Sequence, residues 1–363
     1  MSFINKWIDN YRDKKFKLVR LPKKILFDAI PRNDKDAFKA YPYLNKLRNR
    51  LWLAKSQGLQ AGKMSETPKK FPVFVKPIDG AADGGGNRDC HFIKNIDEFN
   101  KYKNNSKLFW AQYLTGKEYS ADIIMINGNI KFVLVYKIKI RKGKKILEDY
   151  KKVSTKTKLP MKIRKWISKY VKTHTGILNL QYRGDYIFEG SPRPDGAGRF
   201  LNYTRNSKLI DSINNIYMSK NWNWDNIKNR ISKFYVFKVA AVSPFIIPLS
   251  YWTVRKILKK HRIKYYYFYT DISDNGKSFV CLISKKKKRL IECRKELECR
   301  SKQFNMGLTI ILAAQIFFYI KWIRDGRNIL LGTTYISLTL IILSFWRRLM
   351  MNDNNRSKLT PFI

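Results

Sequence analysis

Acidic residues are scarce in this chain. Its 363 residues include 27 Asp and Glu against 74 Lys and Arg, which gives a formal net charge of +47. A field of this sign favours anionic partners such as membrane headgroups, nucleic acid, polyanionic glycans or nucleotides. An AT-rich genome would explain the many Lys, Asn and Ile residues, but it would not explain the shortage of acids.

Cysteine and histidine are also rare. The four cysteines contain no C-x-x-C pair and lie at no metal-ligand spacing from the three histidines. The simplest interpretation is a reduced domain that faces the cytosol. Residues 1–17 lack the apolar core of a secretory signal, and we interpret them as a solvated helix rather than a membrane-surface helix.

No βαβ dinucleotide-binding unit precedes residue 71. Residues 43–61 predict a helix that stops at Gly58, and the apolar run 71–75 predicts one buried strand. Lys76 ends that strand, and a loop with Gly80, Gly84, Gly85 and Gly86 follows. Such a loop can fold over phosphates while a lysine supplies charge. Alone, this pattern occurs by chance in many proteins.

Further strands and a helix are predicted downstream. The expected elements are strands 119–126 and 130–140 joined at Asn127-Gly128-Asn129, a mobile loop over 141–158, a helix over 161–172, and the strands GILNLQYR and DYIFEGSPR with a turn at Gly184.

Three stretches in this order resemble the ATP-grasp superfamily, in particular its carbamoyl-phosphate-synthase-like branch. They are FPVFVKP with the glycine loop, AQYLTGKEYSAD, and NLQYRGDYIFEGSPRPDGAGR, and the resemblance runs from about residue 43 to 199. It implies an α+β ATP-grasp fold in which two subdomains clasp ATP, with the usual N-terminal Rossmann-like subdomain missing or reduced to a remnant. The implied activity is an ATP- and Mg²⁺-dependent ligase that joins a carboxylate to an amine or thiol through an acyl phosphate.

The resemblance also implies a nucleotide site. Lys76 would contact the α- and β-phosphates, the loop Gly84, Gly85, Gly86 would close over the triphosphate, the connector Gln112, Tyr113, Leu114 would face adenine, and Glu118 would bind the ribose hydroxyls. A second upstream cation is usual in the family, and Arg50 fits best, with Lys35 as the runner-up.

For the chemistry, the resemblance implies Gln181, Glu189 and Ser191 as metal ligands. Arg193 would steady the γ-phosphate and the acyl phosphate. Ser191 stands where the family usually has an asparagine, which weakens the metal site and keeps a nucleotide-binding protein without ligase activity as an alternative. A plain ion pair between Glu189 and Arg193 is the structural alternative.

The remaining chain predicts a small basic α+β part over 233–303. It contains a strand and turn over 234–252, a helix over 250–262, a hairpin through Asp274-Asn275-Gly276 and a charged helix over 285–300. The tyrosine run 265–267 favours a half-buried sheet face over a platform that stacks single-stranded bases.

Two apolar stretches, 306–323 and 329–346, are separated by RDGRN and predict a transmembrane helical hairpin with both termini cytoplasmic. A buried helical hairpin is the alternative. The expected organisation is a basic segment 1–42, an ATP-grasp domain 43–232, the basic part 233–303, the hairpin 304–350 and a polar tail 351–363.

The sequence therefore predicts a membrane-anchored ATP-grasp ligase that faces the cytoplasm, with ATP and Mg²⁺ as cofactors. A binding-only membrane scaffold and a membrane-recruited nucleic-acid-binding protein are the alternatives. The carboxylate and the nucleophile are not specified by any motif.

Overall fold

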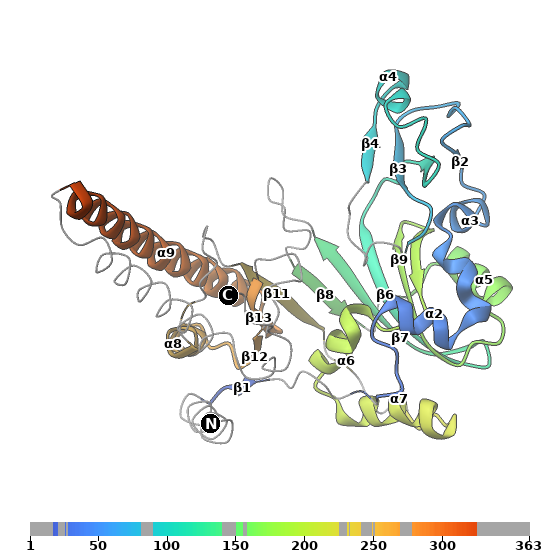
Figure 1. Cartoon of the computed structure of the whole chain (residues 1–363). Coiled ribbons are helices and arrows are strands. Elements are labelled where there is room, and N and C mark those ends of the chain that lie inside the picture. Colours follow the sequence, from blue (N-terminus) through green and yellow to red (C-terminus); the bar gives the residue numbers. More distant parts are fainter. Residues whose placement is uncertain are drawn as a thin grey trace. The chain divides into compact units, whose positions relative to one another are not determined.

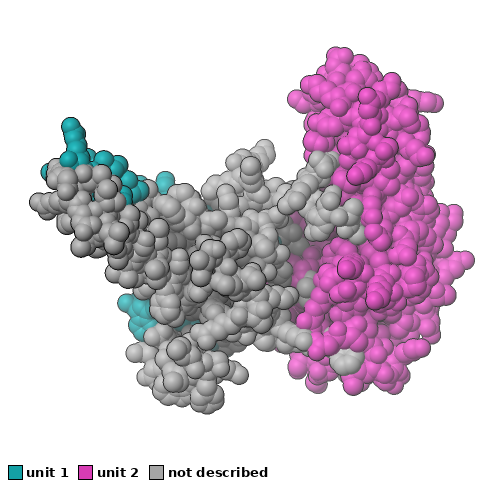
Figure 2. Space-filling model, in the orientation of Figure 1, with its two compact units in different colours: residues 1–21, 140–150, 234–363 teal, residues 22–139, 151–233 magenta. Residues whose placement is uncertain are grey.

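The structure is a computed structural model that describes residues 17–20, 26, 28–80, 90–139, 150–154, 158–224, 231, 233–240, 249, 251–268 and 278–324. The chain divides into two compact units (Figures 1 and 2). Unit 1 comprises residues 1–21, 140–150 and 234–363, and unit 2 comprises residues 22–139 and 151–233. Gly84, Gly85, Gly86 and the stretch 329–346 lie outside the described residues.

The first half of unit 2 combines short helices with a four-stranded antiparallel sheet (Figure 1). Its elements are α2 (Asp34–Ala40), the 3₁₀ helix η1 (Pro42–Arg48), α3 (Arg50–Lys55), β2 (Ala61–Lys63), β3 (Val73–Pro77), β4 (His91–Ile93), α4 (Ile96–Asn100) and β5 (Leu108–Gln112), and the strand order is β2-β5-β3-β4.

The single helix expected over 43–61 is divided at Asn49. The Asn49 side chain accepts a hydrogen bond from the backbone N–H of Trp52 at 2.9 Å and so caps the start of α3. The backbone N–H of Arg50 donates to the carbonyl of Ile78 at 2.8 Å. The prediction therefore placed helical structure in the right region but missed the break at Asn49.

The second half of unit 2 contributes a larger sheet. Its elements are β6 (Glu118–Ile126), β7 (Asn129–Lys139), β8 (Tyr150–Ser154), α5 (Met161–Tyr170), β9 (Gly176–Arg183), β10 (Tyr186–Ser191), the 3₁₀ helix η2 (Asp195–Gly198), α6 (Arg199–Tyr203) and α7 (Ser207–Ser219), with strand order β8-β7-β6-β9-β10. Asn127 and Gly128 have φ angles of 48° and 74° at the predicted hairpin turn. Strand β8 lies inside the segment that was expected to be a mobile loop.

One face of this sheet carries the core of unit 2. Helical residues Leu47 of η1, Leu53 of α3 and Ile163 of α5 pack against Ile123 of β6 and Leu180 of β9, and all five are fully or almost fully buried. Side chains alternate along a strand. The helices cover one face of the sheet, so every second residue of the same strands lies on the opposite face.

Unit 1 contains β1 (Val19–Arg20), β11 (Phe234–Ala240), α8 (Tyr251–Lys260), β12 (Tyr265–Phe268), β13 (Ser278–Ser284) and α9 (Lys287–Arg324), with strand order β1-β12-β13-β11. Tyr266 belongs to its hydrophobic core, and Tyr267 is also buried. The rings of two of the three tyrosines are therefore not accessible to nucleic-acid bases. This contradicts the alternative in which residues 265–267 stack single-stranded bases.

Helix α9 joins two segments that were expected to be separate. Leu290, Cys293 and Leu297 in its first half are fully buried in the core of unit 1. Farther along the same helix, Phe317 is 65% exposed and Phe318 is 67% exposed. Among the helices that the structure describes, none combines the length and the apolar character that a membrane span requires. The first arm of the expected hairpin is thus the continuation of a charged helix.

Candidate functional site

Polar side chains gather on the face of the larger sheet opposite the core. The face carries Ser120 and Asp122 from β6, Asn179 and Gln181 from β9, and Glu189 and Ser191 from β10. In the register of the strands, Gln181 lies between Ser120 and Glu189, and Asn179 lies between Asp122 and Ser191. The three predicted metal ligands therefore share one polar surface with Ser120, Asp122 and Asn179.

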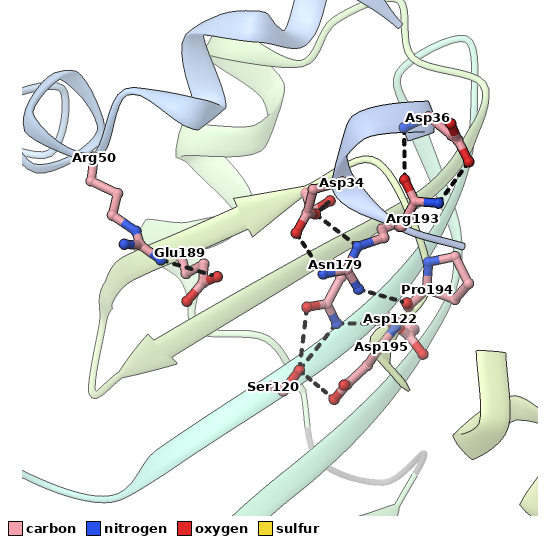
Figure 3. A network of polar contacts seen from close by, with 12 residues as sticks. Asp34, Asp36, Arg50, Ser120, Asp122, Asn179, Glu189, Arg193, Pro194 and Asp195 are labelled. Atoms are coloured by element: carbon pink, nitrogen blue, oxygen red, sulfur yellow. Dashed lines mark hydrogen bonds and ion pairs between the residues drawn. The ribbon is translucent and has the colours of Figure 1, made fainter. Parts of the chain in front are cut away.

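Arg50 reaches this surface from the start of α3. Its Nη2 lies 3.3 Å from Oε1 of Glu189, and the pair is drawn in Figure 3. Only 8% of Arg50 is exposed. A Cβ on Gly80 would lie 3.0 Å from Nε of Arg50, so the glycine allows the guanidinium to pass. Arg50, and not the exposed Lys35, is the upstream cation at Glu189.

Lys76 approaches the same strand from β3 of the smaller sheet. Its Nζ donates a hydrogen bond to the carbonyl of Phe188 at 3.1 Å and lies 5.7 Å from the centre of the Phe188 ring. Burial and the positive charge of Arg50 lower the pKa of Lys76 to about 8, while Glu189 opposes this change. Two cations from different elements thus converge beside one carboxylate.

The connector Gln112–Leu114, which was predicted to face adenine, is hydrogen-bonded to β9. The carbonyl of Leu114 accepts a hydrogen bond from Nη1 of Arg183 at 3.2 Å. Nη2 of Arg183 also donates to Oε2 of Glu118 at 2.7 Å. The carboxylate predicted to bind ribose hydroxyls is therefore already held by an arginine that the sequence analysis missed. The Tyr113 ring makes an edge contact with Phe92, and Gln112 ends β5.

The predicted metal ligands are close together in the sheet but differ in their contacts. Gln181 and Glu189 are cross-strand partners, and both are half-buried. The hydroxyl of Ser191 instead donates to Oδ1 of Asp34 at 2.6 Å. Mg²⁺ accepts carboxylate and amide oxygens and needs few protein ligands when phosphates complete its shell, so Gln181 and Glu189 fit it. Within the described ranges, no three or more His, Cys, Asp or Glu side chains cluster as a metal site.

Arg193 is held by a carboxylate that the sequence analysis did not identify. Its Nε and Nη2 donate to Oδ1 and Oδ2 of Asp34 at 2.7 and 2.9 Å (Figure 3). Burial alone would raise the pKa of Asp34, but the hydrogen bonds and charge of Arg193, with help from Ser191 and Arg50, lower it below its ordinary value. The ion pair that was considered between Glu189 and Arg193 is replaced by two separate pairs, Arg50–Glu189 and Arg193–Asp34.

A further acidic residue on the same face, Asp122, is buried. Asp122 is fully buried and accepts hydrogen bonds from Asn179 Nδ2 at 2.9 Å, from the backbone N–H of Asp195 at 2.8 Å, and from the hydroxyl of Tyr136. Ser120 Oγ donates to Oδ2 of Asp195 at 3.0 Å. Burial and the nearby charge of Asp195 raise the pKa of Asp122 to about 7. The Asp122 carboxyl group is therefore harder to ionise than that of an ordinary aspartate.

Two acidic residues that were missed, Asp122 and Asp34, differ in whether the sequence could have revealed them. Asp122 stands in the otherwise apolar half of the strand EYSADIIMI, and a carboxylate in a buried run is a detectable exception. Asp34 gives no such signal, because it lies in the polar run RNDKD and meets Arg193 only in the folded chain.

Comparisons with known proteins find similarity only among solved structures. No protein-family model and no curated protein matches this chain. Among solved structures, the chain is similar to an L-amino acid ligase from Bacillus licheniformis (TM-score 0.47, 12% identity, 79% of this chain and 74% of that chain covered). It is also similar to an N5-carboxyaminoimidazole synthetase from Staphylococcus aureus complexed with ADP (TM-score 0.49, 13% identity, 68% and 71% covered). A biotin carboxylase from Campylobacter jejuni gives a TM-score of 0.46 at 12% identity, with 69% and 66% covered. At these values the likeness supports no inference about this chain.

Proposed function

We propose that unit 2 is an ATP-grasp ligase that joins a carboxylate to an amine or another nucleophile at the expense of ATP. The observation that supports this best is the convergence of Lys76 and Arg50 on the polar face that carries Gln181 and Glu189. Paired cations beside a metal-binding carboxylate are what the transfer of a phosphoryl group requires. The motif resemblance, which includes the same residues, supports the same activity.

In the proposed reaction, an oxygen of the substrate carboxylate attacks the γ-phosphorus of ATP. The bond from that phosphorus to the β,γ-bridging oxygen breaks, and ADP and an acyl phosphate form. The amine nitrogen then attacks the acyl carbon, the carbon–oxygen bond to phosphate breaks, and the nitrogen loses a proton to solvent as inorganic phosphate leaves.

The chain's own residues bind and orient the reactants in this scheme. Lys76 and Arg50 would bind the phosphates and stabilise the charge that shifts toward ADP. Mg²⁺ held by Gln181 and Glu189 would supply further positive charge to the phosphates. Arg193 would steady the transferred phosphoryl group, and the connector Gln112–Leu114 would face adenine.

Formation of ADP in the presence of Mg²⁺ and a pool of carboxylic acids and amines tests the proposal. Glu189→Gln should abolish turnover while nucleotide still binds, because it removes the anionic metal ligand and leaves the cations. Ser191→Asn should be tolerated, since an amide can still donate to Asp34. Asp97→Asn, a change of an exposed acid on α4, is the matched control. Equal background in wild type and Glu189→Gln would contradict ligase activity.

The binding-only alternative has an observation in its favour. Glu189 is paired with Arg50 and Ser191 donates to Asp34, so two of the three predicted metal ligands already have protein partners. This alternative predicts that wild type binds ATP and forms no ADP with any acid in the pool. The nucleic-acid alternative predicts a steeply salt-dependent affinity for DNA or RNA that survives Lys76→Ala.

Attachment to a membrane, with unit 2 on the cytoplasmic side, is a further part of the proposal. Among the described side chains of α9, the exposed large apolar residues include Met306, Ile310, Ile316, Phe317, Phe318 and Ile320. Residues 316 to 318 are consecutive, and at about 100° per residue they spread over more than half of the helix circumference. A lipid phase is apolar on every side, and basic residues before and after this stretch would complement anionic headgroups.

A further inference from the structure

The ion pair between Asp34 and Arg193 is more buried than another ion pair of the same unit. The Asp34 carboxylate accepts three hydrogen bonds, from Nε and Nη2 of Arg193 and from Oγ of Ser191. Only 17% of the Asp34 side chain and 21% of the Arg193 side chain are exposed. In the comparable pair Arg48–Asp79 the exposures are 40% and 42%. Asp34 therefore fixes the plane of the Arg193 guanidinium.

The remaining donors of Arg193 indicate what this arrangement can bind. A guanidinium group has five N–H donors, one on Nε and two on each terminal nitrogen. Asp34 takes the Nε donor and one on Nη2, and the carbonyl of Pro194 takes one on Nη1 at 3.3 Å. In the contacts of the described residues, one donor on each terminal nitrogen is left. Two N–H groups in one plane match two oxygens of a phosphate.

The position of Arg193 relates these donors to the proposed reaction. Arg193 follows Ser191 at the end of β10, the strand that carries Glu189, and α2 presents Asp34 over the same strand end (Figure 3). Arg50 is engaged with Glu189 at another point along that strand. The two arginines thus pair with different carboxylates. A phosphate bound by Arg193 would not displace Arg50 from Glu189.

We propose that Asp34 is a positioning residue for the terminal phosphate of ATP. It holds Arg193 from the side and leaves the two outer N–H groups for the γ-phosphate. The proposal rests on the proposed function, because it takes ATP as the ligand. It also assigns a role in the site to Asp34, which belongs to the segment 1–42 that was predicted to be separate from the ATP-grasp domain.

The affinity difference between ATP and ADP measures this role, because only ATP carries the γ-phosphate. The full chain and its variants are titrated with each nucleotide and Mg²⁺ by calorimetry. Arg193→Gln should weaken ATP binding by about tenfold and leave ADP binding unchanged, as expected for a lost hydrogen bond to a charged group. Asp34→Asn should lower the ATP-to-ADP affinity ratio in the same way, and the double variant should lose no more than Arg193→Gln alone.

Asp36→Asn is the matched control. Asp36 lies on the same short helix, is exposed, and its carboxylate accepts a hydrogen bond from Asn33. This variant should keep the wild-type ratio. If Asp34→Asn fails to bind ADP, the fold has been disturbed. Asp34→Glu then replaces it, because it keeps the charge and moves the carboxylate by one methylene, and the ratio should again fall.

Two results would overturn the inference while leaving the proposed function standing. An unchanged ratio in the Asp34 variants that bind ADP would show that the ion pair only stabilises the fold. A higher ATP affinity in Asp34→Asn would show that Asp34 competes with phosphate for Arg193. If wild type binds neither nucleotide, the proposed function fails, and the inference that rests on it fails too.

Discussion

Binding of ATP should take up a proton at Lys76, and the ATP affinity should therefore fall above pH 8. Burial, with the positive charge of Arg50, lowers the pKa of Lys76 to about 8 in the free protein, against an opposing effect of Glu189. The ammonium form binds phosphate, so ATP selects the protonated protein and raises the pKa of Lys76 in the complex.

The size of the effect follows from this pKa. A lysine with a pKa of about 8 is about 0.9 protonated at pH 7, about 0.5 at pH 8 and about 0.1 at pH 9. Because apparent affinity scales with the binding-competent fraction, the apparent Kd for ATP should rise about tenfold between pH 7 and pH 9. The protons taken up per ATP bound should increase from about 0.1 to about 0.9 over the same range.

Calorimetry in buffers of different ionisation enthalpy measures the affinity and the proton uptake together. Lys76→Arg keeps a cation that stays protonated throughout this range, so its profile should be flat and its proton uptake close to zero. Lys76→Met should bind ATP weakly at every pH. The ionisation of ATP itself is common to all three proteins and cancels in the comparison. Proton uptake by Lys76→Arg equal to that of wild type would refute Lys76 as the titrating phosphate ligand.

Three other predictions test separate features. Gly80→Ala should reduce ATP affinity severalfold in calorimetry, because its Cβ would lie 3.0 Å from Nε of Arg50; unchanged affinity would contradict the need for glycine beside Arg50. Burial lowers the pKa of His174 to about 4, so the unfolded state binds more protons between pH 6.5 and 4 and stability falls as pH falls through that window. Urea unfolding of His174→Asn should show a loss of stability over this window that is smaller by about 3 kcal/mol, and equal losses would contradict the buried neutral ring. Replacing Phe317 and Phe318 by Glu should shift the full chain from the detergent-extracted to the carbonate-extracted fraction, and continued dependence on detergent would exclude this part of α9 as the attachment.

Much of unit 2 could be predicted from local patterns. The strand GILNLQYR has the same bounds in the structure, and the hairpin turns at Asn127-Gly128 with positive φ at both residues. Alternation of side chains and turn chemistry depend on neighbours in the sequence, so they remain visible without the fold. The division of the helix at Asn49 was missed, because an N-cap within an apolar pattern depends on which N–H groups find partners elsewhere.

The sequence by itself determined part of the candidate site, whereas the tertiary structure alone decided how its residues pair. Lys76, Arg50, Gln181 and Glu189 could be named from motifs, and the fold brings them to one face. Their actual partners come from afar: Asp34 reaches Arg193 across 159 positions, and Asp195 reaches the Asp122 network across 73. Pairing at such separations leaves no periodic trace in the chain, because it depends on strand register and on the side from which each helix packs.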